Sequence, residues 1–275
     1  MQPKNKLTRY LNLIRRFSNW PSYLLFKGRG KADSFTFALR DSIQSGSVQS
    51  GSIQSGSFQI KVPHAMLPAF KESFFDEIYF RQLPPYTIDK SNPIVVDIGA
   101  NVGFFSLYIF SLFPHARVFA FEPMPFNYRQ LQRYREAYPQ FDLHAINQAV
   151  SDTTEPLLLH TTKTDGYTTM ASVFDDPRNQ ESLSVPAITL PELMKHYELP
   201  EIDFLKLDCE GSEYAILYSL PAEQLQKVRA MCVETHRGTQ PNENTLALCD
   251  YLREQQFALN YLDQGKSGYI WAWQA

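Results

Sequence analysis

The stretch IVVDIGANVG, at residues 94–103, decides the fold of this chain. Its first five residues are apolar apart from Asp97, which is typical of a strand buried on both faces of a parallel sheet. A turn containing Gly99 and Gly103 follows, and an amphipathic run begins at Phe104. A strand, a glycine-rich turn and a helix in this order predict a nucleotide-type site at the carboxyl edge of a parallel sheet.

Composition limits the class of protein. The 275 residues are 44% hydrophobic, which is enough for one substantial α/β core with an appendage. The formal net charge of -3 creates no global field that attracts nucleic acid or anionic lipid, so no nucleic-acid partner is expected. The three cysteines have no C-x-x-C spacing, which favours free thiols in a reducing, cytoplasmic setting. No uncharged apolar run reaches the length of a transmembrane helix.

The N-terminus is basic and amphipathic. Lysines and arginines are interspersed with apolar residues between Lys4 and Arg16. Arg15 and Arg16 interrupt the apolar run that a signal peptide would need. A helix here would either pack on the body of the protein or make weak peripheral contact with a membrane surface. The sequence favours packing and leaves the second interpretation open.

Residues 1–92 are predicted to form an N-terminal extension, and residues 93–275 the α/β domain. Within the extension, residues 43–57 contain three copies of a pentapeptide, I/V-Q-S-G-S. A period of five matches neither a strand nor a helix face, so we interpret this QSGS repeat as a flexible hairpin tip between strands at 34–40 and 58–62. The segment after the hairpin is predicted to be a partly helical lid.

Strand and helix patterns alternate from residue 93 onward. The predicted strands span residues 94–98, 117–121, 142–148, 156–160, 185–188, 203–208, 227–234, 257–262 and 268–273, and the predicted helices span residues 103–112, 125–138, 191–197, 211–219 and 242–255. Such alternation implies right-handed βαβ units and a mostly parallel sheet. The final strand pair has no intervening helix and therefore predicts an antiparallel edge hairpin.

The turn after the first strand lacks the G-x-G-x-x-G spacing of dinucleotide-binding sites. Gly99 and Gly103 flank Asn101, and the absence of a Cβ would let the backbone come close to a ligand. Asp97 can accept a hydrogen bond from an ammonium group or hold a water near one. Because the turn contains no Lys or Arg, a pyrophosphate would face Asp97 unfavourably.

Two further strand ends complete the predicted cofactor site. The second strand ends at Glu122, an acid that can accept hydrogen bonds from both hydroxyls of a ribose. The third strand ends near Gln148 and Ala149, where free backbone N–H groups suit the edge of an adenine ring. The predicted site thus offers an acid to an amine, an acid to a ribose and backbone groups to the edge of a purine, but no site for a phosphate. This combination favours S-adenosylmethionine as the cofactor.

Six motifs follow one another along the chain: VVDIGANVGFFSLY, FAFEPMPFN, INQAVSD, ITLPELM, IDFLKLDCEGSEYAIL and CVETH. Over roughly residues 62–275, this series resembles the FkbM family of S-adenosylmethionine-dependent methyltransferases. The resemblance implies a class I methyltransferase (Rossmann-like) fold, with a seven-stranded, mostly parallel sheet and an antiparallel last strand. It also implies O-methylation of hydroxyls on sugars or polyketides. The QSGS repeat is a departure from the family.

The remaining strand ends carry the residues expected at the reacting end. Asp208 and Glu210 follow one strand, while Glu234 and His236 share one face of the next by the period of two. Removal of the hydroxyl proton helps methyl transfer to an alcohol, and His236, with an unperturbed pKa near ~6.5, is a reasonable general base. Asp208 or Glu210 would serve the same purpose or orient the acceptor. The carboxylates also suit a divalent cation such as magnesium, although a metal site is not favoured.

The sequence therefore predicts an S-adenosylmethionine-dependent O-methyltransferase that acts on a hydroxyl of a sugar, glycoconjugate or polyketide-like small molecule. Its partner would be a small-molecule or glycan acceptor. Three rival interpretations stay open: a nucleotide-dependent oxidoreductase on a similar sheet, a non-catalytic scaffold that only binds the cofactor, and a methyltransferase acting on RNA or protein. The missing glycine spacing argues against the oxidoreductase.

Overall fold

The computed structural model describes residues 6–29, 33–40, 58–85, 87–161 and 181–274. Its centre is a seven-stranded sheet in the order β12-β13-β11-β10-β3-β4-β5, in which β13 runs antiparallel to both of its neighbours and the other pairs are parallel. The predicted class I methyltransferase fold is thereby confirmed. The strands span Ile94–Ile98 (β3), Arg117–Phe121 (β4), Asp142–Ile146 (β5), Phe204–Leu207 (β10), Ala230–His236 (β11), Phe257–Asp263 (β12) and Ser267–Gln274 (β13).

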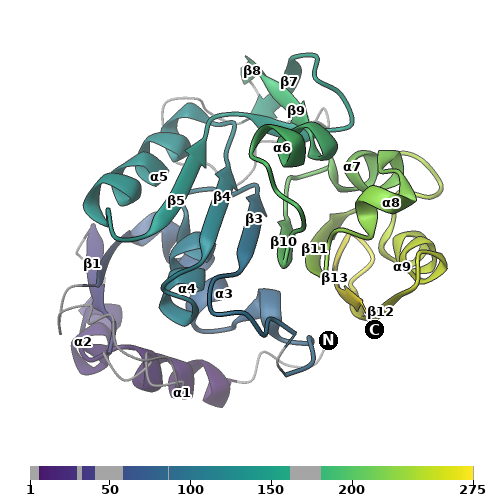
Figure 1. Cartoon of the computed structure of the whole chain (residues 1–275). Helices are drawn as coiled ribbons and strands as arrows, with labels where there is room; N and C mark the ends of the chain where they lie inside the picture. The colour runs from purple at the N-terminus through teal and green to yellow at the C-terminus, as the bar shows by residue number, and fades with distance from the viewer. Residues whose placement is uncertain (1–5, 30–32, 41–57, 86, 162–180, 275) are drawn as a thin grey trace.

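Helices cover both faces of this sheet (Figure 1). Neighbouring residues of a strand point to opposite faces, so Val95 belongs to one hydrophobic core and Val96 to the other. Burial on both faces explains the nearly uninterrupted apolar runs of the parallel strands. The first core is covered by α4 (Phe104–Leu112) and α5 (Pro125–Ala137), and the second by α6 (Leu190–His196), α7 (Glu213–Ser219), α8 (Ala222–Leu225) and α9 (Thr245–Glu254).

The N-terminal segment adds a further layer next to α4 (Figure 1). The pairing of β1 with β2 is antiparallel, which confirms the predicted hairpin strands, whereas the repeat at residues 43–57 lies outside the described residues. None of the helices described is both long and apolar enough to cross a membrane. The elements are α1 (Lys6–Arg16), α2 (Trp20–Arg29), β1 (Ser34–Ala38), β2 (Gln59–Pro63), η2 (His64–Met66), α3 (Leu67–Phe74) and η3 (Ile78–Phe80).

The helix after the glycine turn is buried on every side, whereas the sequence predicted an amphipathic helix. Residues 104–111 of α4 are all buried. The outer side of α4 packs against α3. The ring centres of Phe70 and Phe104 lie 5.3 Å apart, and those of Phe74 and Tyr108 lie 5.4 Å apart. The N-terminal extension and the α/β domain therefore share one hydrophobic core.

The strand predicted at residues 185–188 is split in two at Pro186. Proline has no N–H to donate, so the ladder cannot continue through it and the chain changes partners. The first piece pairs antiparallel with the preceding strand, and the second pairs parallel with a short strand after β5. The two small sheets are formed by β7 (Leu157–Thr161) with β8 (Glu181–Val185), and by β6 (Ala149–Ser151) with β9 (Ala187–Thr189).

The helix predicted at residues 211–219 begins two residues later, at Glu213. Glu210 and Gly211 have φ values of 52° and 120°, which a right-handed helix does not allow. The chain therefore makes a left-handed turn between β10 and α7. This turn holds the residues expected at the reacting end on the carboxyl edge of the sheet.

Candidate active site

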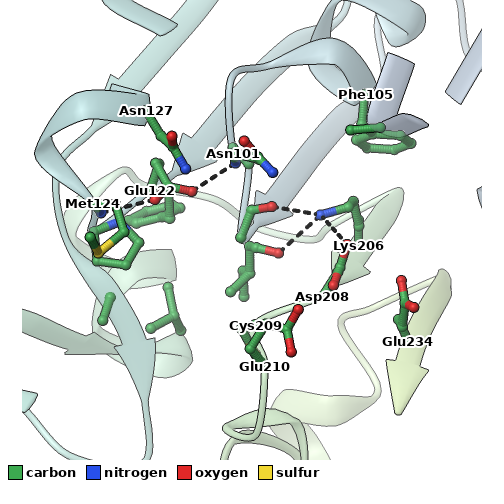
Figure 2. Close-up of a pocket in the computed structure, with 18 of the residues that line it drawn as sticks. Asn101, Phe105, Glu122, Met124, Asn127, Lys206, Asp208, Cys209, Glu210 and Glu234 are labelled. Atoms are coloured by element: carbon green, nitrogen blue, oxygen red, sulfur yellow. Dashed lines mark hydrogen bonds and ion pairs between the residues drawn. The ribbon is translucent and has the colours of Figure 1, made fainter. Parts of the chain in front are cut away.

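A cavity of about 350 Å³ lies at the carboxyl ends of β3, β4 and β10, at the sheet edge predicted for the cofactor (Figure 2). Five predicted cofactor residues line it: Gly99, Asn101, Glu122, Gln148 and Ala149. Three predicted carboxylates also line it: Asp208, Glu210 and Glu234. Of the remaining predicted residues, Asp97, Gly103 and His236 are not among the described residues that form its wall.

Glu122 is held by the backbone on both sides. Its Oε2 accepts a hydrogen bond from the N–H of Asn101 (2.7 Å), and its Oε1 accepts one from the N–H of Met124 (2.8 Å). Burial raises the pKa of Glu122 to about 7, although both N–H groups act in the opposite direction. Asn101 adopts a left-handed conformation (φ 53°), and its Oδ1 is buried with no partner among the described residues. An unsatisfied buried acceptor beside a cavity is suited to a ligand N–H or O–H.

A buried lysine that the sequence analysis missed connects the acids of two strands, and Figure 2 shows its side chain next to Asp208. Lys206 Nζ lies 3.2 Å from Asp97 Oδ1 and 3.5 Å from Asp208 Oδ2, and it donates to the carbonyl of Gly99 at 2.8 Å. Burial alone would lower the pKa of Lys206, but the two carboxylates outweigh it and raise that pKa. A lysine inside an apolar, doubly covered strand was the signal that sequence reasoning could have used.

Asp97 is fully buried and does not face the cavity. Its Oδ2 accepts a hydrogen bond from Ser106 Oγ (2.7 Å), and its other oxygen faces Lys206. The direct contact with an ammonium group that we expected would therefore have to displace Lys206. Asp97 instead holds the ammonium group of Lys206, a residue of β10, next to the carboxyl end of β3.

The two glycines of the turn make close protein contacts. Gly99 has a φ of +75°, and a Cβ added there would lie 1.8 Å from the carbonyl oxygen of Asp208. Gly103 has a φ of +85°, and a Cβ there would lie 2.6 Å from Leu131 Cδ1 on α5. The neighbouring strand end and helix therefore require these glycines, in addition to any approach of a ligand.

The carboxylates at the other strand ends have unusual proton affinities. Burial raises the pKa of Glu210 to about 7. Burial, followed by the nearby charge of Asp208, raises the pKa of Glu234 well above its ordinary value. Asp208 Oδ2 accepts a hydrogen bond from the hydroxyl of Tyr79 (3.2 Å), a residue of the N-terminal extension. The extension thus contributes a side chain to the reacting end.

His236 is enclosed by carboxylates. Its Nδ1 lies 3.1 Å from Glu213 Oε1, and its Nε2 lies 3.4 Å from Glu210 Oε2. Burial lowers the pKa of His236, but the three nearby glutamates outweigh burial and raise it to about 10. Glu213 is itself fully buried and accepts from the N–H groups of Cys209 and Gly211. It therefore fixes both the turn after β10 and the histidine ring.

Residues 97–259 match the family model described as the methyltransferase FkbM domain. The chain belongs to the FkbM methyltransferase family. The matched region begins at Asp97 and ends in β12, so it contains every strand end that borders the cavity. The FkbM resemblance carried by the six sequence motifs is thereby confirmed.

Curated relatives of this FkbM-family chain include AMB antimetabolite synthetase AmbE of Pseudomonas aeruginosa, which is 28% identical over 233 residues. That match covers 70% of this chain but only 10% of AmbE. Methyltransferase sdnD of Sordaria araneosa is 29% identical, with 60% of this chain and 73% of sdnD covered. Hexuronic acid methyltransferase AglP of Haloferax volcanii is 25% identical, with 58% and 63% covered. Among solved structures, methyltransferase FkbM from Methylobacillus flagellatus gives a TM-score of 0.46 at 15% identity, covering 70% of this chain and 46% of that one.

Proposed function

We propose that this FkbM-family protein is an S-adenosylmethionine-dependent O-methyltransferase whose acceptor is a hydroxyl of a sugar, glycoconjugate or polyketide-like small molecule. The observation that carries the proposal is a single cavity bordered by a polar cofactor-type wall and a cluster of carboxylates. The relatives support the acceptor class, since one is a hexuronic acid methyltransferase, one a 2-O-methyltransferase (NoeI of Sinorhizobium fredii) and one a 31-O-demethyl-FK506 methyltransferase (FkbM of Streptomyces tacrolimicus).

The residues of the cavity fit the cofactor better than they fit a dinucleotide. Glu122 offers carboxylate oxygens to a ribose, and Asn101 offers its unsatisfied Oδ1. Lys206 is the one lysine or arginine among the described residues that line the cavity, and two carboxylates already pair with it. A pyrophosphate would therefore find no available cation there. When bound, S-adenosylmethionine supplies an electrophilic methyl group on a sulfonium.

We assign Glu210 as the proton acceptor at the reacting end. A pKa of about 7 leaves much of this carboxyl ionised near neutral pH while keeping its affinity for a proton high, which suits a general base. The acceptor hydroxyl would give its proton to an oxygen of Glu210 as the hydroxyl oxygen takes the methyl group. His236, with a pKa of about 10, carries a proton near neutral pH and suits the role of a fixed positive charge beside Glu210.

A divalent cation is the second candidate occupant of the reacting end. Ligand atoms of Asp208, Glu210 and His236 all lie within 4.8 Å of one another. The protonated imidazole, however, already lies between Glu210 and Glu213 and provides the positive charge that a metal would bring. We therefore expect methyl transfer to persist in EDTA, and loss of activity that Mn²⁺ or Mg²⁺ restores would overturn this assignment.

Calorimetry with S-adenosylhomocysteine tests the cofactor assignment. We expect binding by the full chain, and about tenfold or more weakening in Glu122→Gln, because a charge-assisted hydrogen bond is lost while one oxygen still accepts a backbone N–H. Glu223→Ala, which removes an exposed acid on α8, is the control and should bind like the wild type. No binding at millimolar ligand would refute the proposal, and binding of NAD in its place would support the oxidoreductase.

The scaffold interpretation needs a separate test. Glu210→Gln should retain S-adenosylhomocysteine binding but lose about 10²-fold or more in methyl transfer to an acceptor found by screening sugars and polyketides. If the protein only binds the cofactor, neither the wild type nor the variant should methylate any sugar or polyketide in this screen.

A further inference from the structure

Exposed apolar side chains are concentrated on the first two helices. Of nine large hydrophobic residues that are exposed in the described part of the chain, six lie on α1 and α2. They are Leu7, Tyr10, Leu11, Ile14, Leu24 and Leu25. Scattered exposed leucines need no explanation, but a concentration on two adjacent helices indicates a binding surface.

The geometry of α1 separates this surface from the core. Leu7, Leu11 and Ile14 follow the i, i+4, i+7 spacing of one helix face, and they are 65%, 56% and 40% exposed. The opposite face is buried, where Leu13 joins the core and Asn12 Nδ2 donates to a backbone carbonyl after α3. The helix therefore has a second apolar face that none of the described residues buries.

The two helices form one continuous surface. Lys27 Nζ on α2 lies 5.8 Å from the centre of the Tyr10 ring on α1. Figure 1 shows α1 and α2 together at the end of the molecule formed by the N-terminal layer. Leu24 lies about one turn before Lys27 on α2, and both Leu24 and Leu25 are exposed. We call the six exposed side chains, together with Lys6, Arg15 and Lys27, the N-terminal surface.

Charge identifies the partner. The first 31 residues contain eight of the 26 lysines and arginines and no acid, which leaves 18 basic against 29 acidic residues in the rest of the chain. Arg9 and Arg16 pair inward with Asp76 and Glu77. Lys6, Arg15 and Lys27 are exposed around the leucines. The net charge of -3 is thus the sum of a basic N-terminal segment and an acidic remainder of the chain.

We propose that the N-terminal surface docks the protein on an anionic lipid bilayer. Leucine and isoleucine flanked by lysine and arginine on a strongly amphipathic helix are typical of helices that lie in the plane of a membrane interface. Protein interfaces, in contrast, are depleted in lysine and enriched in aromatic residues. This docking is separate from the proposed methyl transfer, because the surface contains none of the residues that line the cavity.

Vesicle co-sedimentation of the full chain tests the proposal. We expect binding to vesicles of phosphatidylcholine mixed with phosphatidylglycerol, weak binding to phosphatidylcholine alone, and release at 1 M salt, where the Debye length falls to about 3 Å. Arg15→Gln should weaken partitioning roughly fivefold, since one cation near an anionic surface is lost. Leu11→Ser should weaken it severalfold, whereas Leu246→Ser, which changes a leucine 47% exposed on α9, should have no effect.

Two outcomes would overturn the proposal. One is equal binding to anionic and neutral vesicles, or an equal loss for Leu11→Ser and Leu246→Ser. The other is a wild-type protein that does not bind vesicles but forms a dimer in light scattering, with Leu11→Ser dissociating the dimer. That result would assign the surface to a second copy of the chain. Unchanged circular dichroism and S-adenosylhomocysteine binding would show that the variants are folded.

Discussion

Removal of the Lys206 ammonium group tests the centre of the site. Lys206→Met keeps the length and apolar character of the side chain but leaves Asp97 buried and without its cation. Asp97 is completely buried, and Ser106 then supplies the hydrogen bond that remains to its carboxylate. Breaking a buried ion pair by removing one partner costs about 3–5 kcal/mol. For a chain of this size, that cost lowers the thermal midpoint by roughly 10 °C.

A double-mutant cycle measured by urea unfolding isolates the ion pair. Asp97→Asn removes the unpaired charge, so the double variant with Lys206→Met should be less destabilised than the two single costs together, with a coupling of at least about 1 kcal/mol. Arg253→Met is the control, because its pair with Asp250 is exposed and should contribute less than about 1 kcal/mol.

Two results would refute this reasoning. If Lys206→Met costs no more than Arg253→Met, the lysine does not compensate a buried charge. If the Lys206 and Asp97 costs add, the two groups act independently despite their separation of 3.2 Å.

Gly99→Ala should destabilise the protein by about 1–3 kcal/mol more than Gly265→Ala in urea unfolding, because both positions have positive φ but only Gly99 has a backbone oxygen within a Cβ contact distance. Equal costs would mean that the clash with Asp208 is relieved freely. Between the ordinary pKa of a glutamate and about 7, Glu122 is protonated more in the folded than in the unfolded protein. The free energy of unfolding should therefore fall by up to roughly 3 kcal/mol as the pH rises through this range. Glu122→Gln should flatten that slope in unfolding curves, and an unchanged slope would contradict the raised pKa.

Sequence patterns correctly predicted a mostly parallel sheet with an antiparallel edge hairpin, because connectivity restricts how successive strands pair. Each βαβ unit must cross over with the same hand, so the series of alternating elements leaves few topologies. The strand pair without a helix between its members could only be antiparallel, and β12 and β13 are. The ends of parallel strands then meet at one edge, which is why Gly99, Glu122 and Asp208 come together around the cavity.

The same patterns could not predict which groups face each other across that edge. A period of two places Glu234 and His236 on one face of β11, but it does not reveal that Glu213 of α7 holds the ring from another element. The charge on His236 therefore depends on contacts between segments distant in the chain. Likewise, the outer side of α4 is buried by α3, a partner that periodicity within α4 cannot indicate.

The buried row of Asp97, Lys206 and Asp208 gives Asp97 a different role from the one expected from sequence. Two carboxylates and one ammonium group leave one negative charge, and Asp208 is the member that is partly exposed and lines the cavity. Asp97 neutralises the lysine, and Asp208 then presents the remaining charge to whatever occupies the cavity. A site built in this way disfavours phosphate and favours a cationic ligand, because the charge that selects the ligand is fixed by a lysine that the ligand does not need to contact. The proposed preference for a sulfonium cofactor thus rests on the pairing of β3 with β10, and not on the glycine turn alone.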